Sequence, residues 1–150
     1  MKIYYREKSG GIEILRCFGI EGRVEIPGMI DGKLVISAAP YAFSSHMDEK
    51  EELKNASLWE VSEGLGFGRE EHVLAGNDVE EIVFPDTLKE IGRYIFYGCG
   101  NLKKLEFSDS LMQIGCGAFT GCHALEKLTV HMRQGKKSGV KEMLGEMWQR

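Results

Sequence analysis

The residues of this chain that could do chemistry do not fall into a catalytic or metal-binding spacing. Four cysteines and four histidines are the obvious candidates: Cys17, Cys99, Cys116, Cys122, His46, His72, His123 and His131. Structural zinc sites usually place two ligands with about two to four residues between them, and the sequence contains no CxxC pair. The histidines share no spacing, and no serine, histidine and aspartate arrangement emerges. We therefore expect no catalytic residue, no cofactor and no metal ion, and we expect that the protein is not an enzyme.

A glycine-rich stretch, Gly64-Leu65-Gly66-Phe67-Gly68, is a further candidate for ligand binding. A phosphate-binding loop lies between a strand and a helix, because the helix N-terminus and the glycine backbone hold the phosphate together. Neither element is evident here, and Arg69-Glu70-Glu71 is a poor start for a helix that binds an anion. We interpret the stretch as a loop.

The elements that must position any site follow a repeat: residues 102–124 resemble residues 79–101, and residues 125–132 begin a third copy. Eight of the 23 positions are identical: Phe84/Phe107, Asp86/Asp109, Leu88/Leu111, Ile91/Ile114, Gly92/Gly115, Phe96/Phe119, Gly98/Gly121 and Cys99/Cys122. The shared positions are mostly apolar residues, glycines and turn-formers. A fixed period of this size predicts a solenoid, in which every coil directs the same set of side chains inward.

Each copy also predicts its own local structure. Ile82 and Phe84 alternate with more polar residues, which predicts a short strand with one buried face. Stacked coils should pair such strands in parallel, about 4.8 Å apart. Pro85-Asp86-Thr87 predicts a turn. Gly92 and Gly115 should supply either a positive φ or a close approach of two backbones.

The copy from Leu102 to Cys122 reads L-x-x-L-x-F-x-x-x-L-x-x-I-G-x-x-A-F-x-G-C. This pattern resembles the bacterial BspA-like leucine-rich repeats, also called the Treponema pallidum type. The copy from Val79 to Cys99 matches it with Ile95 in place of alanine. The resemblance implies an α+β solenoid, whose coil has a strand, a turn, a second extended segment and a short helix. It also implies a cell-surface adhesion role in some members.

A fainter copy lies upstream, over residues 24–46. Val24-Glu25-Ile26-Pro27 resembles Ile82-Val83-Phe84-Pro85, and Ala38 stands where the later copy has Ile91. This coil should therefore be thinner at that point.

Both ends of the chain carry patterns typical of caps. Apolar residues alternate on either side of Ser9-Gly10-Gly11, which predicts an N-terminal β-hairpin. Five apolar residues share one face of a predicted C-terminal amphipathic helix: Val140, Met143, Leu144, Met147 and Trp148. That helix could cap the last coil, cover a neighbouring module or bind a partner helix, and capping is favoured because an uncovered final strand exposes its edge.

We expect a single domain, with the period broken between Ser44 and Asp78. There we expect a degenerate coil with a strand near Trp59 and an excursion, in which Trp59 has a core or interface role. The predicted units are a cap (1–23), a degenerate repeat (24–46), an irregular coil or insertion (47–78), two repeats (79–101 and 102–124), a partial repeat (125–132) and the helix (136–150).

Charge and hydropathy limit the partners and the location. The formal net charge is −4, which argues against nonspecific nucleic-acid binding. No apolar run approaches about 20 residues, so we expect no membrane span. The N-terminus lacks the apolar stretch of a signal peptide, and Cys99 and Cys122 suggest a structural rather than a redox role. We expect a cytoplasmic protein in a reducing compartment, or a cell-surface one if a leader has been removed, and a monomer or weak oligomer.

The best candidate for binding is the strand face that points away from the core. Its outward residues are Glu81, Val83, Lys104, Glu106, Lys127 and Thr129. We expect them to line up in columns and to contact an unidentified protein partner, although a solvated face with weak cross-strand pairs is the alternative. The sequence thus predicts a noncatalytic interaction module, with a structural or regulatory segment of a larger bacterial protein, or an adhesion module, as alternatives.

Overall fold

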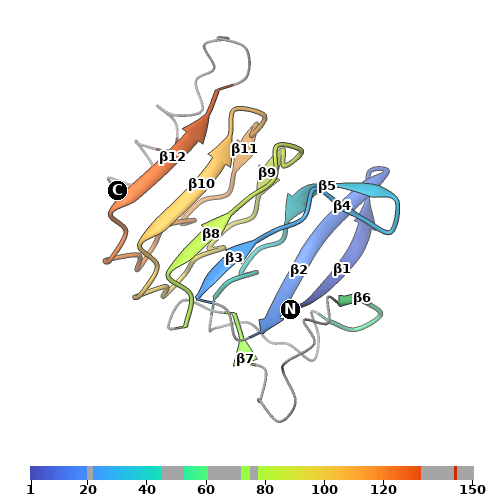
Figure 1. Cartoon of the computed structure of the whole chain (residues 1–150), viewed down its shortest axis with the longest axis horizontal. Helices are drawn as coiled ribbons and strands as arrows, with labels where there is room; N and C mark the ends of the chain where they lie inside the picture. The colour runs from blue at the N-terminus through green and yellow to red at the C-terminus, as the bar shows by residue number, and fades with distance from the viewer. Residues whose placement is uncertain (20–21, 45–52, 61–71, 75–77, 133–143, 145–150) are drawn as a thin grey trace.

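The computed structural model describes residues 1–19, 22–44, 53–60, 72–74, 78–132 and 144. Its strands are β1 (Lys2–Lys8), β2 (Gly11–Gly19), β3 (Arg23–Glu25), β4 (Met29–Ile30), β5 (Lys33–Ala38), β6 (Ser57–Glu60), β7 (His72–Val73), β8 (Glu81–Val83), β9 (Glu90–Ile91), β10 (Lys104–Ser108), β11 (Gln113–Ile114) and β12 (Lys127–His131). They form a solenoid, in which the coils that begin at β3, β8 and β10 each contribute strands to two sheets (Figure 1).

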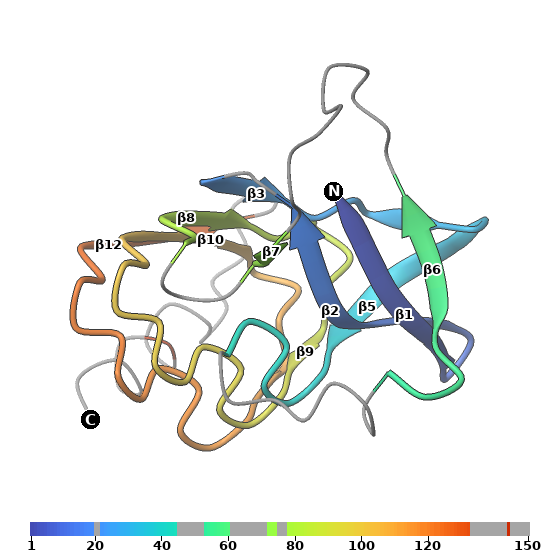
Figure 2. The same cartoon turned by 90° about the horizontal axis from the view of Figure 1, so that it is seen from below.

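The first sheet is the parallel ladder, made of β3, β8, β10 and β12. Each strand pairs with the equivalent strand of the next coil, so that Ile82 lies beside Leu105 and Leu105 beside Leu128. The second sheet continues from β11 and β9 through β5, β2 and β1 to β6. Figure 2 shows the parallel ladder along one side, with the coils running away below it. The predicted period and the short parallel strands are confirmed.

Aromatic side chains stack from coil to coil inside the solenoid. The rings of Phe84 and Phe107 are 4.9 Å apart and nearly parallel, with an interplanar angle of 7°. A second stack contains Phe43, Phe96 and Phe119, with ring centroids 6.1 and 5.7 Å apart. Because neighbouring coils place equivalent rings at the same depth, the rings pack on one another in the core.

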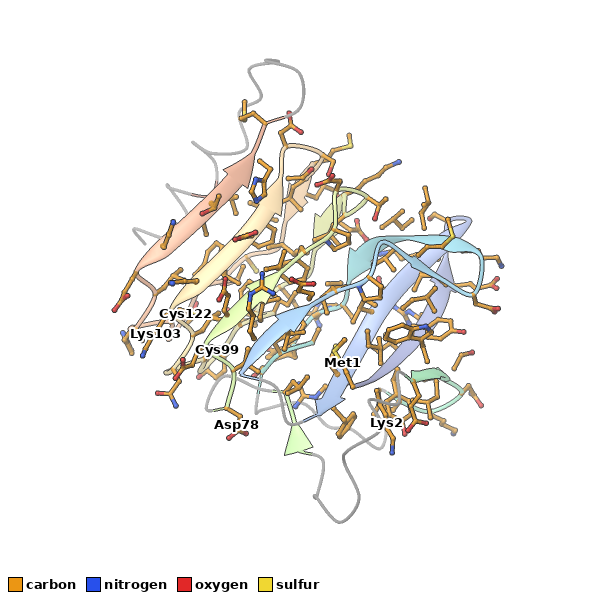
Figure 3. The ribbon with its side chains drawn as sticks, in the orientation of Figure 1. Met1, Lys2, Asp78, Cys99, Lys103 and Cys122 are labelled. Atoms are coloured by element: carbon orange, nitrogen blue, oxygen red, sulfur yellow. The ribbon has the colours of Figure 1, made fainter. Side chains whose placement is uncertain are left out.

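The repeated cysteines join neighbouring coils through their thiols. The Cys99 Sγ donates to the carbonyl oxygen of Phe43 at 3.3 Å, and the Cys122 Sγ donates to that of Phe96 at 3.4 Å. Figure 3 shows the two cysteines in line, near one end of the strands. None of the four cysteines, all of which lie in the described residues, forms a disulfide. The contacts of Cys99 and Cys122 are therefore those of packing residues.

Turns replace the short helix that the resemblance implied for each coil. Tyr94, Gly98, Gly117 and Gly121 have positive φ angles, between 51° and 84°, and such residues interrupt a right-handed helix. The backbone amides bond to the next coil instead: the Gly98 amide donates to Thr120 at 3.1 Å. In the described residues only Leu144 is helical, so the α part of the α+β prediction is not found in the coils.

The N-terminal hairpin is present, with β1 and β2 antiparallel about Ser9 and Gly10. Both turn residues have positive φ, 50° and 79°, as a tight hairpin turn requires. β2 then pairs in parallel with β5. The hairpin therefore extends the second sheet beyond the first coil.

Between residues 44 and 79 the chain leaves the stack as an insertion. β3 pairs directly with β8, and the Ile26 amide donates to Val83 at 2.9 Å, so no degenerate coil lies between them. The described parts of the insertion pair with the hairpin: β6 is antiparallel to β1 and β7 to β2. Trp59 of β6 packs against the core, as the sequence predicted.

The C-terminal segment lies almost wholly outside the described residues. Leu144 is helical and fully buried in the core, and the helix over 136–150 stays a prediction. No helix within the described residues has the length and apolar character that crossing a membrane requires.

Gly92 and Gly115 mark the closest approach between coils. Neither has a positive φ. A Cβ atom on Gly92 would lie 2.3 Å from the backbone nitrogen of Pro40, and one on Gly115 would lie 2.1 Å from that of Arg93. Of the two predicted roles, close backbone approach is therefore the correct one.

We expect Gly115→Ala to lower the free energy of unfolding by about 3 kcal/mol, because the added methyl group meets backbone that cannot move aside. Gly100→Ala is the matched control, since a Cβ there meets nothing within 4 Å. Urea unfolding of both variants measures the difference, and equal stabilities would contradict the close-approach account.

Candidate binding face

The outward side chains of the parallel ladder fall into two rows across its four strands. The first row is Arg23, Glu81, Lys104 and Lys127, and the second row is Glu25, Val83, Glu106 and Thr129. The register thus brings together all six residues that the sequence singled out. It adds Arg23 and Glu25, which the match of Val24-Glu25-Ile26 to the later repeat could have placed in the rows.

At the β3 end of this face the charges are paired within the protein. The Arg23 guanidinium contacts the carboxylates of Glu25 and Glu81, with 3.5 Å between Arg23 Nε and Glu81 Oε2. All three side chains are accessible to solvent, and the exposed fraction is half or more for Arg23 and Glu25. Screening by water makes such pairs weak, so they add little to stability. They do balance the positive and negative charges at this end of the face.

At the β12 end the first row has two adjacent cations. Lys104 and Lys127 are exposed and directly opposite one another. The acid next to them in the second row, Glu106, lies 3.1 Å from the Nε2 of His131. Within the described residues no ion pair joins either lysine to a carboxylate. Among the described residues, the positive charge at this end of the face is therefore not balanced by an ion pair.

A second polar cluster crosses the other sheet. Strand register aligns Arg6, Glu13, Ser37, Glu90 and Gln113 in one row across five strands. Four residues of this row, all but Arg6, line a pocket of about 440 Å³, whose lining also includes two glycines. A pocket with two carboxylates is a second candidate binding site.

The two carboxylates of this pocket are engaged by the protein's own side chains. Glu13 is almost fully buried, at 2% exposure of its side chain, and accepts from Arg6 Nε at 2.9 Å and Lys8 Nζ at 3.0 Å. The Ser37 hydroxyl lies 3.1 Å from Glu13 Oε2 and 2.8 Å from Glu90 Oε1. Lys8 also bonds to Glu90. The cluster therefore ties the hairpin to the first two coils, and we interpret it as structural.

Mutual attraction shifts the pKa values of this pair in opposite directions. The ammonium of Lys8 donates to Glu90 and lowers the pKa of Glu90 below 4.5. The hydrogen bond to Glu90, followed by that to Glu13, raises the pKa of Lys8 above 10.5. Sequence reasoning missed this cluster, because its members come from the hairpin and two coils and share no motif.

The remaining candidates from the sequence give no site. No group of three histidine, cysteine, aspartate or glutamate side chains in the described residues could hold a metal ion. His123 and Cys116 are exposed. The glycine-rich stretch 64–68 and His46 lie outside the described residues, as does the side chain of His72.

Comparison with known proteins identifies the repeat. Residues 70–138 match the sequence family described as "BspA type Leucine rich repeat region (6 copies)". This part of the chain is a BspA-type leucine-rich-repeat region. In this chain the L-x-x-L-x-F segment contributes β10 to the parallel ladder. A search of curated protein sequences finds no match.

Two solved structures are similar to the chain. One is a leucine rich cell surface protein from Faecalibacterium prausnitzii A2-165, with a TM-score of 0.56 and 20% identity over 86% of this chain. This chain spans 30% of that protein, so the likeness concerns the fold of one portion. The other is the T. pallidum leucine-rich-repeat protein, with a TM-score of 0.35 and 20% identity, covering 97% of this chain and 92% of that one.

We expect Lys8→Met to remove the pH dependence that this pair gives to stability. In the wild type, the pair stabilises the fold above the unfolded pKa of Glu90, 4.5, and this contribution is lost as the pH falls through the lower folded value. It is also lost as the pH rises above 10.5, the unfolded pKa of Lys8, through its higher folded value. At neutral pH the variant should lose about 1 kcal/mol, because Lys8 is partly exposed.

Thermal unfolding followed across pH measures this effect. Lys89→Met, at an exposed lysine elsewhere on the second coil, serves as the control and should keep the wild-type profile. Parallel profiles for wild type and Lys8→Met would show that the pair does not stabilise the fold.

Proposed function

We propose that the chain is a noncatalytic protein-interaction module and that the outward face of the parallel ladder binds the partner. The observation that carries the proposal is the contrast between the two sides of the same strands. Inward positions repeat nearly unchanged and are buried, as at Leu105 and Phe107. Outward positions vary in type from coil to coil, except where Lys104 and Lys127 coincide, yet the register holds them in straight rows. A rigid scaffold with variable side chains suits recognition of another protein.

The pocket on the second sheet is a less suitable binding site than the face of the ladder. Its carboxylates are occupied by Arg6, Lys8 and Ser37, so a ligand would have to displace bonds that hold the hairpin in place. A ligand on the face of the parallel ladder would break no bond of this kind, because the core is packed from the inward side chains of the same strands.

A second candidate role is that of an adhesion segment within a longer surface protein. It is favoured by one comparison: the structure of similar fold comes from a protein described as a leucine rich cell surface protein, and this chain spans 30% of it. The mechanism of recognition would be the same. The two roles differ in location, which cell fractionation with an antibody to the chain would decide between cytoplasm and surface.

A photo-crosslinking amino acid placed at Thr129 tests the binding face. We expect irradiation in an extract of the source organism to give one crosslinked protein of defined mass, which also crosslinks when purified. Gln113 is the matched control position, because it is exposed on the opposite sheet. Equal crosslinking from Gln113, or none from Thr129, would contradict the proposal, and a product of twice the chain's mass would identify a second copy as the partner.

A further inference from the structure

We propose that the β12 end of the ladder binds an acidic side chain from an extended segment of the partner protein, between Lys104 and Lys127. The inference rests on the proposed function of this face and adds the chemistry of its partner. It starts from the register, which sets the two lysines side by side on adjacent parallel strands. Neighbouring strands lie about 4.8 Å apart, close enough for both ammonium groups to reach one carboxylate.

This arrangement is unfavourable for the isolated protein. Like charges directly opposite each other in a sheet repel. Arg23 contacts Glu81, the residue beside Lys104 in the first row, and His131 contacts Glu106 in the second row. Glu81 thus has a cationic partner, and Glu106 a hydrogen-bonding partner, other than the two lysines.

The surroundings of the lysine pair favour a protein segment over a polyanion. A nucleic acid or polyphosphate would continue its charge along the rows, where the neighbouring positions are Glu81, Glu106 and Glu25 and offer no further lysine to neutralise it. A peptide can place one carboxylate over the lysines and uncharged residues elsewhere. Thr129, next but one along β12 from Lys127, offers a hydroxyl to the peptide, and Val83 offers an apolar contact two strands away.

Fluorescence anisotropy with a labelled, threonine-rich peptide that carries a single glutamate tests the inference. We expect saturable binding that weakens as salt is added, and no comparable binding by the peptide with glutamine in place of glutamate. In the Lys104→Glu/Lys127→Glu double variant the affinity should fall at least about tenfold, as expected when two exposed charge contacts become repulsive. Amide chemical shifts should move at Lys104 and Lys127 on titration.

A matched double variant separates a local site from overall charge. Lys54→Glu/Lys89→Glu makes the same change in net charge at two other exposed lysines and should bind the peptide as the wild type does. An equal loss in both double variants would overturn the proposal, because the attraction would then be nonspecific. Unchanged affinity in the Lys104→Glu/Lys127→Glu variant, or no binding by the wild type, would overturn it as well.

Neutral substitution provides a second readout that does not depend on how charge reversal affects folding. The Lys104→Gln/Lys127→Gln variant should unfold at the same temperature as the wild type or slightly higher, because the repulsion is gone. It should nevertheless bind the peptide more weakly than the wild type does. A variant that binds with wild-type affinity contradicts the proposal. Crosslinking from Thr129 with no binding of the glutamate peptide overturns the acidic partner and keeps the binding face, whereas failure of both overturns the two proposals together.

Discussion

The structure depends on how closely one coil can approach the next. At Gly92 and Gly115 the backbone of a coil lies directly against the backbone of the preceding coil, where a Cβ atom would be 2.1 to 2.3 Å from backbone nitrogen. This contact lets the Gly92 amide reach the carbonyl of Ala38, and the Gly115 amide that of Ile91, both at 2.9 Å. The spacing that results suits ring stacking and thiol bonding between neighbouring coils. A side chain at either glycine would force the coils apart.

That spacing also fixes the geometry available for function. Once the inward residues have set the register, the outward residues must form straight rows one strand apart. Charge in those rows is distributed unevenly: Arg23 forms ion pairs, whereas Lys104 and Lys127 near β12 form none with the described part of the chain. The scaffold and the proposed binding face therefore use different residues of the same strands, and substitutions in one need not disturb the other.

Much of the ladder could be predicted from the sequence, because the repeat is local and its period is constant. Equal spacing between equivalent residues allows only one register, and that register places Glu81, Lys104 and Lys127 in line. The same reasoning was insufficient at the hairpin. A register shift beside Glu13, between β2 and β5, breaks the simple alternation there, and Lys8 meets Glu90 across 82 residues of sequence. Neither the register shift nor the Lys8–Glu90 bond produces a periodic pattern in the sequence.

By itself the sequence determined the solenoid, its period, the short parallel strands and the row positions, since these follow from which residues recur every 23 places. Only the tertiary structure decided three further points. The first coil stacks directly on the second while the insertion pairs with the hairpin. The coils close through turns, because positive φ angles send their amides to the neighbouring coil. The carboxylates of Glu13 and Glu90 are held together by Ser37 and Lys8. Each of these depends on contacts between distant segments, whose free energy no local pattern records.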